Sequence, residues 1–442
     1  MHELIDTEEG GVRSKMSEKI KADLIIIGGG MAGVTAAIAA SRGGVNVLLV
    51  EKGGYFGGTA TGSVLGELNG YTHHGQKIYG GITAEIIDNM LTQGFAHLRY
   101  SVPMTGNPSI VVDRVRYEPE RLKIFFDEML IREKVTFLLH SALDRIEEGE
   151  GGSTYKVYLT NGYECVEVEG SIVIDASGNA EVVYKANKPT WKPSKQEAQA
   201  VSLIFRMGGI DAAAYQRFPL DELRKMILAG NEQGFLPAKY CAINLIAETN
   251  DAIINMTRIS EVDHESMADM TKAEIEGRKQ ISKAIPYLRT YPGFEKAYLS
   301  GIAPSLGIRE ARRIIGRYTL TQEDILSGKK FTDAVAIGCY PMDIHGKKNQ
   351  AVEFTAIGGD GIYTIPFSSL LPNEMERVIA AGKCISVDSG AFSAIRTMPT
   401  VMAIGEAAGT AAGLSIRHKV PPHRLPVIEI QRVLKKGGHL LE

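Results

Sequence analysis

Cysteine is scarce in this sequence: the 442 residues include only four, and no two of them form a C-x-x-C pair. Their wide spacing excludes a redox-active dithiol and a zinc ribbon, because both need closely paired cysteines, and no metal site is predicted. Reduced thiols are typical of a cytoplasmic protein, which is the location that we expect. The four positions are Cys165, Cys241, Cys339 and Cys384.

The sequence also lacks an excess of charge of either sign and a long uninterrupted apolar run. With 49 Lys and Arg against 52 Asp and Glu, it shows no dense basic stripe, so no nucleic-acid partner is expected. Residues 1–20 lack the apolar core of a signal peptide and are expected to form a flexible leader. The most apolar stretch, residues 398–414, contains Glu406, which favours a buried helix over a membrane span.

A complete β-α-β pattern stands near the N-terminus. Residues 22–27 form a β-branched apolar run, and GGGMAG, an alanine-rich helical segment, a second apolar run and Glu51 follow. In a dinucleotide-binding unit, Gly28 permits the tight turn, Gly30 lets the backbone approach the pyrophosphate, and Gly33 lets the helix pack closely. Glu51 stands where a carboxylate accepts hydrogen bonds from the adenosine ribose. The pattern predicts a nucleotide-binding Rossmann unit; a glycine-rich turn without a ligand is the alternative.

The segment after this unit distinguishes FAD from NAD. E-K-x-x-x-x-G-G-T-x-T, from Glu51 to Thr61, resembles bacterial FAD-dependent oxidoreductases with the glutathione-reductase-type FAD fold, related to the fumarate reductase and succinate dehydrogenase flavoproteins. The I-V-I-D-A-S-G segment ending at Gly178 and S-A-I-R-T-M-P-T at 393–400 resemble the same family. Because Thr59 and Thr61 stand where some relatives carry a flavin-linking histidine, the resemblance implies non-covalent FAD. Besides the glycine loop and Glu51, it assigns cofactor contacts to Met31, Ala32, Lys52, Gly57, Gly58, Thr59, Thr61, Val135, Asp175, Gly178, Arg396, Pro399 and Thr400.

A helix is expected to begin at the last of these segments. Thr397 can cap it, and Pro399 suits its first turn. In the family such a helix points its N-terminus at the flavin pyrimidine edge, where the reduced flavin carries negative charge, and Arg396 adds positive charge there. Glycines recur in this helix at every fourth position and predict a smooth face packed against the Rossmann core. They are Gly405, Gly409 and Gly413.

The resemblance implies an α/β fold of two domains. A Rossmann-like FAD-binding domain is expected to consist of residues 21–185 and 334–442, with a substrate or cap domain at 186–333 between them. Short alternating apolar runs within 196–260 predict a mainly antiparallel sheet. Residues 266–285 are expected to form a helix.

Candidate catalytic residues follow the cap segment. Hydride transfer from an alcohol or amine needs a base near the flavin, and His345 is the first candidate, with Asp343 or Arg309 to orient it. His73, shortly after the G-G-T loop, is a further candidate at the flavin face. For His345 the alternative is a structural histidine. The arginines of G-I-R-E-x-R-R either bind a carboxylate or support the reduced flavin, or they form a salt-bridged turn; they are Arg309, Arg312 and Arg313, with Glu310 between them.

The leading hypothesis is a FAD-dependent dehydrogenase that transfers hydride between a small organic substrate and the flavin N5. No second G-x-G-x-x-G follows a later strand, so the electron donor or acceptor is unidentified and a dedicated NAD(P)H domain is not expected. Three alternatives stay open: a fumarate-reductase-like alkene reductase, a flavoprotein acting in tRNA modification, and a non-catalytic flavin-binding module. Membrane attachment is not expected, and homo-oligomer formation is left open.

Overall fold

The computed structural model describes residues 20–104, 109–246, 249–345 and 352–442. The leader predicted at 1–20 lies outside these residues except for Ile20, which begins the first strand. Within the described residues, no helix is both long enough and apolar enough to cross a membrane.

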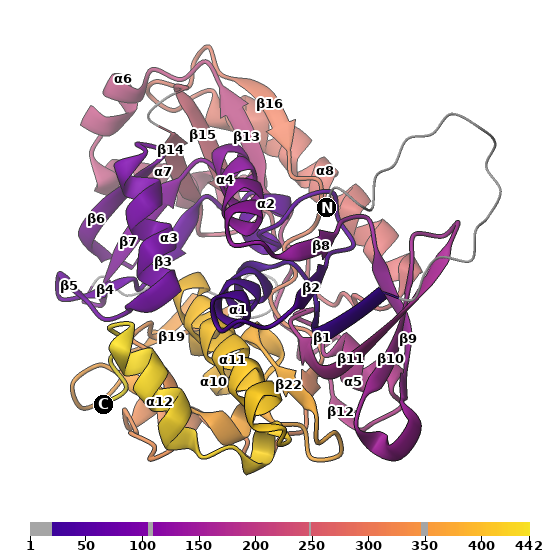
Figure 1. Cartoon of the computed structure of the whole chain (residues 1–442). Coiled ribbons are helices and arrows are strands. Elements are labelled where there is room, and N and C mark those ends of the chain that lie inside the picture. Colours follow the sequence, from indigo (N-terminus) through magenta and orange to yellow (C-terminus); the bar gives the residue numbers. More distant parts are fainter. Residues whose placement is uncertain (1–19, 105–108, 247–248, 346–351) are drawn as a thin grey trace.

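A seven-stranded sheet forms the centre of the fold. The long strand β11 (Cys165–Asp175) pairs in parallel with β1 (Ile20–Ile27), which pairs in parallel with β2 (Val47–Val50) and through it with β8 (Thr136–Leu138). The other edge of β11 is shared: its first half pairs antiparallel with β10 (Tyr155–Thr160), which continues to β9 (Ala142–Glu148), and its end pairs in parallel with β22 (Val378–Ala380). The sheet thus joins the two ends of the sequence, as the predicted Rossmann-like fold requires (Figure 1).

Two helices cross in close contact against this sheet: α1 (Met31–Arg42) and α11 (Met398–His418). A Cβ on Gly405 would lie 2.2 Å from the Ala32 carbonyl oxygen, and one on Gly409 would lie 2.1 Å from that of Ala36. The predicted close packing is confirmed for Gly405 and Gly409, where the α1 backbone occupies the space that side chains would need, but not for Gly413. Figure 1 shows the two helices side by side in front of the sheet.

We expect Gly409→Ala to destabilise the protein and Gly413→Ala to leave it stable. At Gly409 the new methyl overlaps backbone atoms of Ala36, and such overpacking costs about 1–3 kcal/mol or more. At Gly413 the nearest atom is a Val45 methyl at 3.5 Å, an ordinary contact, and alanine is favoured in a helix by about 1 kcal/mol. Thermal unfolding of the two variants measures the difference; equal midpoints would contradict the packing described here.

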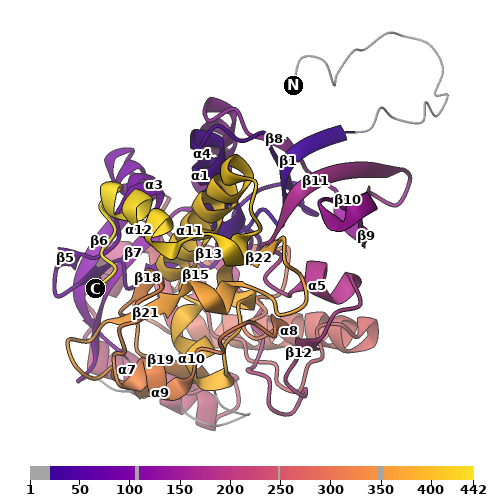
Figure 2. The same cartoon turned by 60° about the horizontal axis from the view of Figure 1, so that its bottom comes forward.

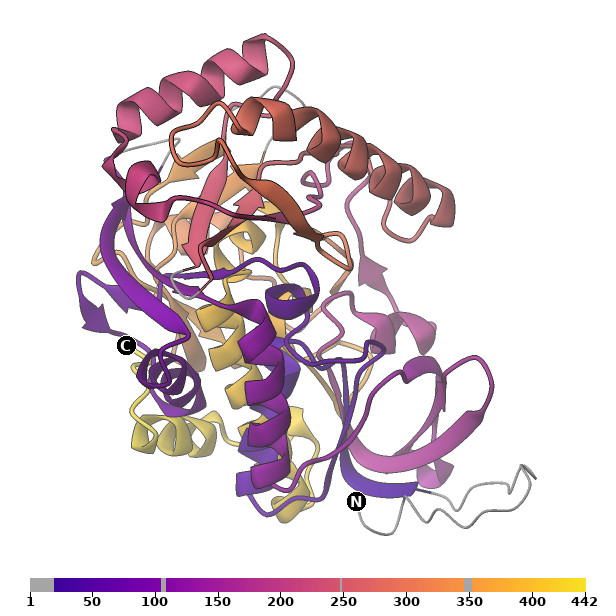
Figure 3. The same ribbon diagram turned by 90° about the horizontal axis from the view of Figure 1, so that it is seen from above.

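A second hydrophobic core lies under a four-stranded antiparallel sheet, whose order is β14 (Ala242–Ile246), β15 (Asp251–Asn255), β13 (Phe205–Gly208) and β16 (Tyr298–Ile302). The predicted antiparallel strands and the helix predicted at 266–285 are both present, the helix as α8 (Met267–Leu288). The sequence analysis did not identify two further helices, α6 (Ala212–Arg217) and α7 (Leu220–Glu232). Seen from above, α7 and α8 lie at the margin of the molecule (Figure 3).

The remaining elements connect these two cores. A three-stranded sheet of β3 (Glu67–Asn69), β7 (Val111–Tyr117) and β6 (Ala96–Pro103) lies between them, and α10 (Ser389–Ile395) packs on α9 (Gln322–Leu326) and β19 (Met342–His345), as Figure 2 shows. The other helices are α2 (Thr59–Gly62), α3 (Gly81–Thr92), α4 (Pro119–Arg132), α5 (Glu181–Lys185) and α12 (Val427–Lys436). The other strands pair two by two: β4 (Thr72–His73) with β5 (Gln76–Lys77), β12 (Thr190–Trp191) with β17 (Arg313–Ile314), β18 (Ala334–Gly338) with β21 (Tyr363–Pro366), and β19 with β20 (Val352–Thr355).

Candidate active site

The glycine loop between β1 and α1 has the tight geometry that a phosphate site needs. Gly28 has φ +106°, and a Cβ on it would lie 2.5 Å from the Ala176 carbonyl oxygen. A Cβ on Gly33 would lie 1.8 Å from the Gly28 carbonyl oxygen, so only glycine allows α1 to begin this close to the strand. Gly30 differs, because a Cβ there would meet no protein atom nearer than the Gly58 Cα at 3.9 Å. Its lack of a side chain leaves open space in a large cavity, which it lines.

Glu51 holds the two loops beside the cavity in place. Its carboxylate accepts hydrogen bonds from the Gly29 N–H at 2.8 Å and the Gly53 N–H at 2.7 Å. Each carboxylate oxygen can accept more than one hydrogen bond, so both can still accept one from a ribose hydroxyl. Lys52 lines the cavity beside it, and its ammonium lies 3.5 Å from the Glu181 carboxylate.

The G-G-T loop lies against the glycine loop. The Gly57 N–H donates to the Gly29 carbonyl at 2.8 Å, and Gly57, Gly58 and Thr59 line the cavity. Thr61 is completely buried and donates its hydroxyl to the Phe56 carbonyl at 2.6 Å, so its side chain closes the loop and does not line the cavity.

The A-S-G turn after β11 is held by Asp175. This buried carboxylate accepts from the backbone N–H and hydroxyl of Ser177 and from the Val182 N–H, and burial raises its pKa to about 6. Asp175 therefore holds the turn through these hydrogen bonds and does not line the cavity, whereas Ser177 and Gly178 do. Val135, just before β8, is buried and is not part of the lining.

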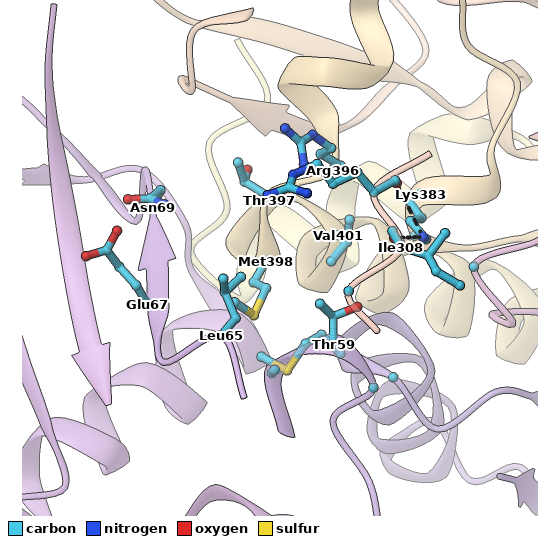
Figure 4. A pocket seen from close by; sticks show the side chains of 18 of the residues that line it. Thr59, Leu65, Glu67, Asn69, Ile308, Lys383, Arg396, Thr397, Met398 and Val401 are labelled. Atoms are coloured by element: carbon cyan, nitrogen blue, oxygen red, sulfur yellow. Dashed lines mark hydrogen bonds between the residues drawn. The ribbon is translucent and has the colours of Figure 1, made fainter. Parts of the chain in front are cut away.

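The beginning of α11 forms a further wall. Arg396, Thr397, Met398 and Val401 line the cavity, whereas Pro399 and Thr400 do not (Figure 4). Thr397 occupies the N-cap position, as predicted, but its side chain does not cap the helix. Its hydroxyl lies 3.0 Å from that of Thr400, which in turn lies 2.8 Å from the Tyr79 hydroxyl. The backbone N–H groups of the first turn therefore lack a side-chain cap.

These loops border one continuous cavity of about 350 Å³, which extends from Glu51 and the glycine loop past α11 to strands β3, β7, β14 and β15. The residues fit FAD: a glycine cradle at a helix N-terminus for the pyrophosphate, a carboxylate for the ribose, and an uncapped helix N-terminus further along for the electronegative flavin edge. Figure 4 shows Glu67 and Asn69 on β3 across the space from Arg396 and Met398.

We define a polar chamber at the far end of the cavity by nine of the described side chains that line the cavity. Only Arg309, Asp343 and Arg396 among them were singled out from the sequence. The other six come from strands and a loop that the sequence analysis did not connect with the site. The chamber residues are Glu67, Asn69, Arg114, Tyr240, Asn244, Asn255, Arg309, Asp343 and Arg396.

Asp343 and the arginines form the charged part of the chamber. The Arg396 guanidinium donates to the Asp343 carboxylate at 3.3 Å, and the Tyr340 hydroxyl donates to the same oxygen at 3.1 Å. Arg309 instead donates to the Ala200 carbonyl at 2.6 Å and the Ser202 hydroxyl at 2.9 Å. Burial, reinforced by the charges of Arg396 and Arg258, lowers the pKa of Arg309 to about 9, although the Asp343 carboxylate works in the opposite direction.

Lys383 also lines the cavity and was missed by the sequence analysis. Its ammonium donates to the carbonyls of Ile308 at 2.7 Å and Arg309 at 3.3 Å, and thereby ties the turn after β22 to the loop that carries Arg309 (Figure 4). Burial lowers the pKa of Lys383 to about 8. The only sequence signal for it was its place two residues after the apolar run V-I-A-A, at the carboxyl end of a parallel strand.

The opposite wall of the chamber was not visible in the sequence either. The Glu67 carboxylate accepts from Arg114 at 3.2 Å and from Arg116 at 3.3 Å. Tyr240 lines the cavity, and burial raises the pKa of Tyr240 to about 12, so its hydroxyl stays protonated. The sequence V-V-D-R-V-R-Y of β7 did contain one indication of this wall, namely charged residues among apolar ones. Burying a charge is costly unless it is paired, so charged residues in a buried strand indicate a polar site.

Two predicted catalytic residues are not placed in the cavity. His73 lies on β4, where its ring contacts the Asp360 carbonyl at 2.9 Å and lies tilted against the His74 ring, and it is not part of the lining. His345 ends β19 two residues after Asp343, and its side chain lies outside the described part of the structure. The arginines of G-I-R-E-x-R-R have different surroundings. Arg309 lines the chamber, whereas Arg312 pairs with Glu265 and the buried Arg313 pairs with Glu310.

Comparisons with known proteins agree with this geometry. The model of the family described as FAD dependent oxidoreductase matches residues 23–434. A geranylgeranyl bacteriochlorophyll reductase-like protein from Thermoplasma acidophilum shares the fold at a TM-score of 0.51 and 13% identity, over 95% of this chain and 84% of that chain. The p-nitrophenol 4-monooxygenase PnpA from Pseudomonas putida DLL-E4 gives 0.50 and 10%, over 96% and 87%. Among the curated proteins, none matches.

The matched family spans nearly the whole chain and includes every loop that borders the cavity. Its members are enzymes, which removes the alternative of a non-catalytic flavin-binding module. The chain belongs to the FAD dependent oxidoreductase family, and its cofactor is FAD.

Proposed function

We propose that the protein is a dehydrogenase that removes a hydride from a small organic substrate, with Asp343 as the proton acceptor. The observation that carries this proposal is the continuity of the cavity: the space bordered by the FAD loops leads directly into a chamber with a buried carboxylate. FAD supplies the hydride-accepting atom, the flavin N5. The protein supplies the proton acceptor, the charges that orient the substrate and the exclusion of bulk water.

In this proposal the roles follow from the contacts. The glycine loop holds the pyrophosphate, Glu51 the adenosine ribose, and Thr59 and Gly178 border the path between them and the flavin. The N-terminus of α11 and Arg396 stabilise negative charge on the flavin pyrimidine edge. Lys383 positions the Arg309 loop through its two carbonyl contacts. Five residues that the sequence assigned to the cofactor then shape the site and do not touch the cofactor through their side chains. They are Thr61, Val135, Asp175, Pro399 and Thr400.

Asp343 suits the role of proton acceptor better than the other carboxylate in the chamber. Glu67 already accepts from two arginines, one on each oxygen. Asp343 accepts from the Tyr340 hydroxyl and from Arg396, and these two contacts fix its orientation. When the substrate hydroxyl or amine loses hydride from carbon, the proton on its oxygen or nitrogen passes to Asp343, which balances the oxidation.

The test is an anaerobic reduction of the purified flavoprotein by sugars, hydroxy acids and amines. Loss of flavin absorbance with one class of compound identifies that class as the substrate and shows the direction of reaction. If no compound bleaches the flavin while the dithionite-reduced protein converts an alkene acceptor, the dehydrogenase proposal is wrong.

One observation favours a second candidate, the fumarate-reductase-like alkene reductase. Such an enzyme needs a cationic proton donor beside a bound anion, and burial lowers the pKa of Arg309 to about 9, closer to neutrality than an exposed guanidinium. In that direction Arg309 would give a proton to the substrate carbon, and a proton from water would restore the guanidinium. The same anaerobic experiment separates the two candidates.

We expect acid denaturation to release all the flavin into the supernatant. Thr59 and Thr61 offer no nucleophile for a stable flavin linkage, and His73 contacts the Asp360 carbonyl away from the cavity lining. Absorbance of the trichloroacetic acid supernatant and pellet measures the partition. Yellow colour that stays with the pellet would show a covalent bond.

A further inference from the structure

The polar chamber contains side-chain atoms that have no hydrogen-bond partner among the described residues. The Asn69 amide oxygen is buried in this way, as are the Nε groups of Arg114 and Arg396. A buried polar group without a partner destabilises the folded protein, because it has lost its hydrogen bonds to water. Three such atoms around one space indicate that the chamber is built for a ligand with several hydrogen-bonding groups.

The hairpin of β14 and β15 presents more such groups to the same space. Ala242 and Asn255 are paired across the hairpin, and Asn244 lies two residues along the strand on the same face. Both asparagines line the chamber, as does Tyr240 just before β14. Their side chains make no hydrogen bond to any described residue, although Asn244 is only 4% exposed. An apolar substrate would leave these donors and acceptors unsatisfied, whereas hydroxyl groups would pair with them.

The charges of the chamber add a second requirement. Arg114 and Arg396 each have a carboxylate partner, in Glu67 and Asp343. Arg309 pairs with no carboxylate among the described residues, and its two hydrogen bonds go to neutral oxygens. Among the described residues that define it, the chamber carries three guanidiniums and two carboxylates, so a monoanionic ligand would balance its charge. A carboxylate matches the planar fork of a guanidinium.

We propose that the substrate is a polyhydroxylated carboxylic acid, of the aldonic or uronic acid kind. Its carboxylate pairs with Arg309, and its hydroxyls bind Asn69, Tyr240, Asn244 and Asn255. This inference rests on the proposed function, since it names the substrate class for the same site. It gives Arg309 the role of substrate binding and assigns the hairpin of the second sheet to specificity.

The test compares ligands that differ only in charge and hydroxyl groups. Gluconate carries both features, glucitol only the hydroxyls, hexanoate only the carboxylate, and 1-hexanol neither; glucuronate serves as a second hydroxy acid. Binding to the oxidised FAD-loaded enzyme is followed by calorimetry and by the change in flavin absorbance. We expect a hydroxy acid to bind at least about 10-fold more tightly than glucitol and than hexanoate, because each feature contributes 1.4 kcal/mol or more. If hexanoate or hexanol binds as tightly as both hydroxy acids, or glucitol does, the proposal is wrong.

Two variants then assign each preference to its residues. Arg309→Met should remove the preference for gluconate over glucitol and leave the preference over hexanoate, whereas Asn255→Leu should reduce the preference over hexanoate and leave the preference over glucitol. Each variant is the control for the other, and FAD content with the thermal midpoint reports whether each is folded. If both variants lose both preferences equally while folded, the assignment of residues is wrong.

The outcome separates this inference from the proposed function. Tight binding of a hydroxy acid that does not bleach the flavin would support the substrate class and contradict the dehydrogenase. Bleaching by neutral alcohols or simple amines, with no advantage for hydroxy acids, would support the dehydrogenase and overturn the substrate class.

Discussion

Replacing Gly30 with alanine is expected to weaken FAD binding while the apoprotein folds normally. Gly30 has φ −69°, which any residue adopts, and the nearest protein atom to a new Cβ is 3.9 Å away. The methyl group would therefore meet nothing until the pyrophosphate approaches the backbone of the loop. Crowding of this kind costs about 1–3 kcal/mol, so the FAD affinity should fall roughly 10- to 100-fold. Titration of the apoprotein with FAD, followed by quenching of flavin fluorescence, measures the change.

Gly33→Ala is the matched control for this prediction. The same methyl group at Gly33 would lie 1.8 Å from the Gly28 carbonyl oxygen, so it displaces the protein backbone itself. We expect that variant to lose thermal stability in the apoprotein as well as FAD binding. A Gly30→Ala protein that binds FAD as tightly as the wild type would place the pyrophosphate elsewhere.

The contrast between these glycines shows what sequence reasoning could reach. A β-α-β unit is a local pattern, because its turn, helix and strand are adjacent in the chain. The spacing of Gly28, Gly30 and Gly33 therefore predicts which close contact each glycine allows. The expected close packing is found at Gly33 and at Gly405 and Gly409 of α11, because in each case backbone packs against backbone. The Rossmann-like fold could be predicted for the same reason.

The polar chamber could not be predicted because no local pattern marks it. Its residues come from β3, β7, the β14–β15 hairpin, the Arg309 loop, β19 and the turn before α11, which are far apart in the sequence. Single residues such as Asn69 and Tyr240 look like ordinary surface positions until the fold places them around one space. Even within the motifs, side-chain direction was not available, so Thr61 and Thr400 were assigned to the cofactor although their hydroxyls bond to protein groups.

Asp343→Asn is expected to slow flavin reduction by about 100- to 10,000-fold, the range over which a positioned acid or base contributes. The amide keeps the size of the side chain and can still accept from Tyr340 and Arg396, but it cannot take up a proton. FAD content should be unchanged, because Asp343 lies at the chamber end of the cavity, beyond the loops that border the nucleotide. Stopped-flow reduction under anaerobic conditions, with the best compound from the substrate screen, measures the rate.

Two companion variants make this result decisive between the candidate bases. Tyr340→Phe removes only the hydrogen bond that orients the Asp343 carboxylate. A hydrogen bond to a charged group contributes about 1.5–3 kcal/mol, so we expect flavin reduction to slow by about 10-fold. His345→Ala tests the other base suggested by the sequence. If Asp343→Asn keeps the full rate while His345→Ala loses it, the proton acceptor is His345, and Asp343 serves to hold Arg396. If only Asp343→Asn is slow, the buried Asp343 carboxylate is the base.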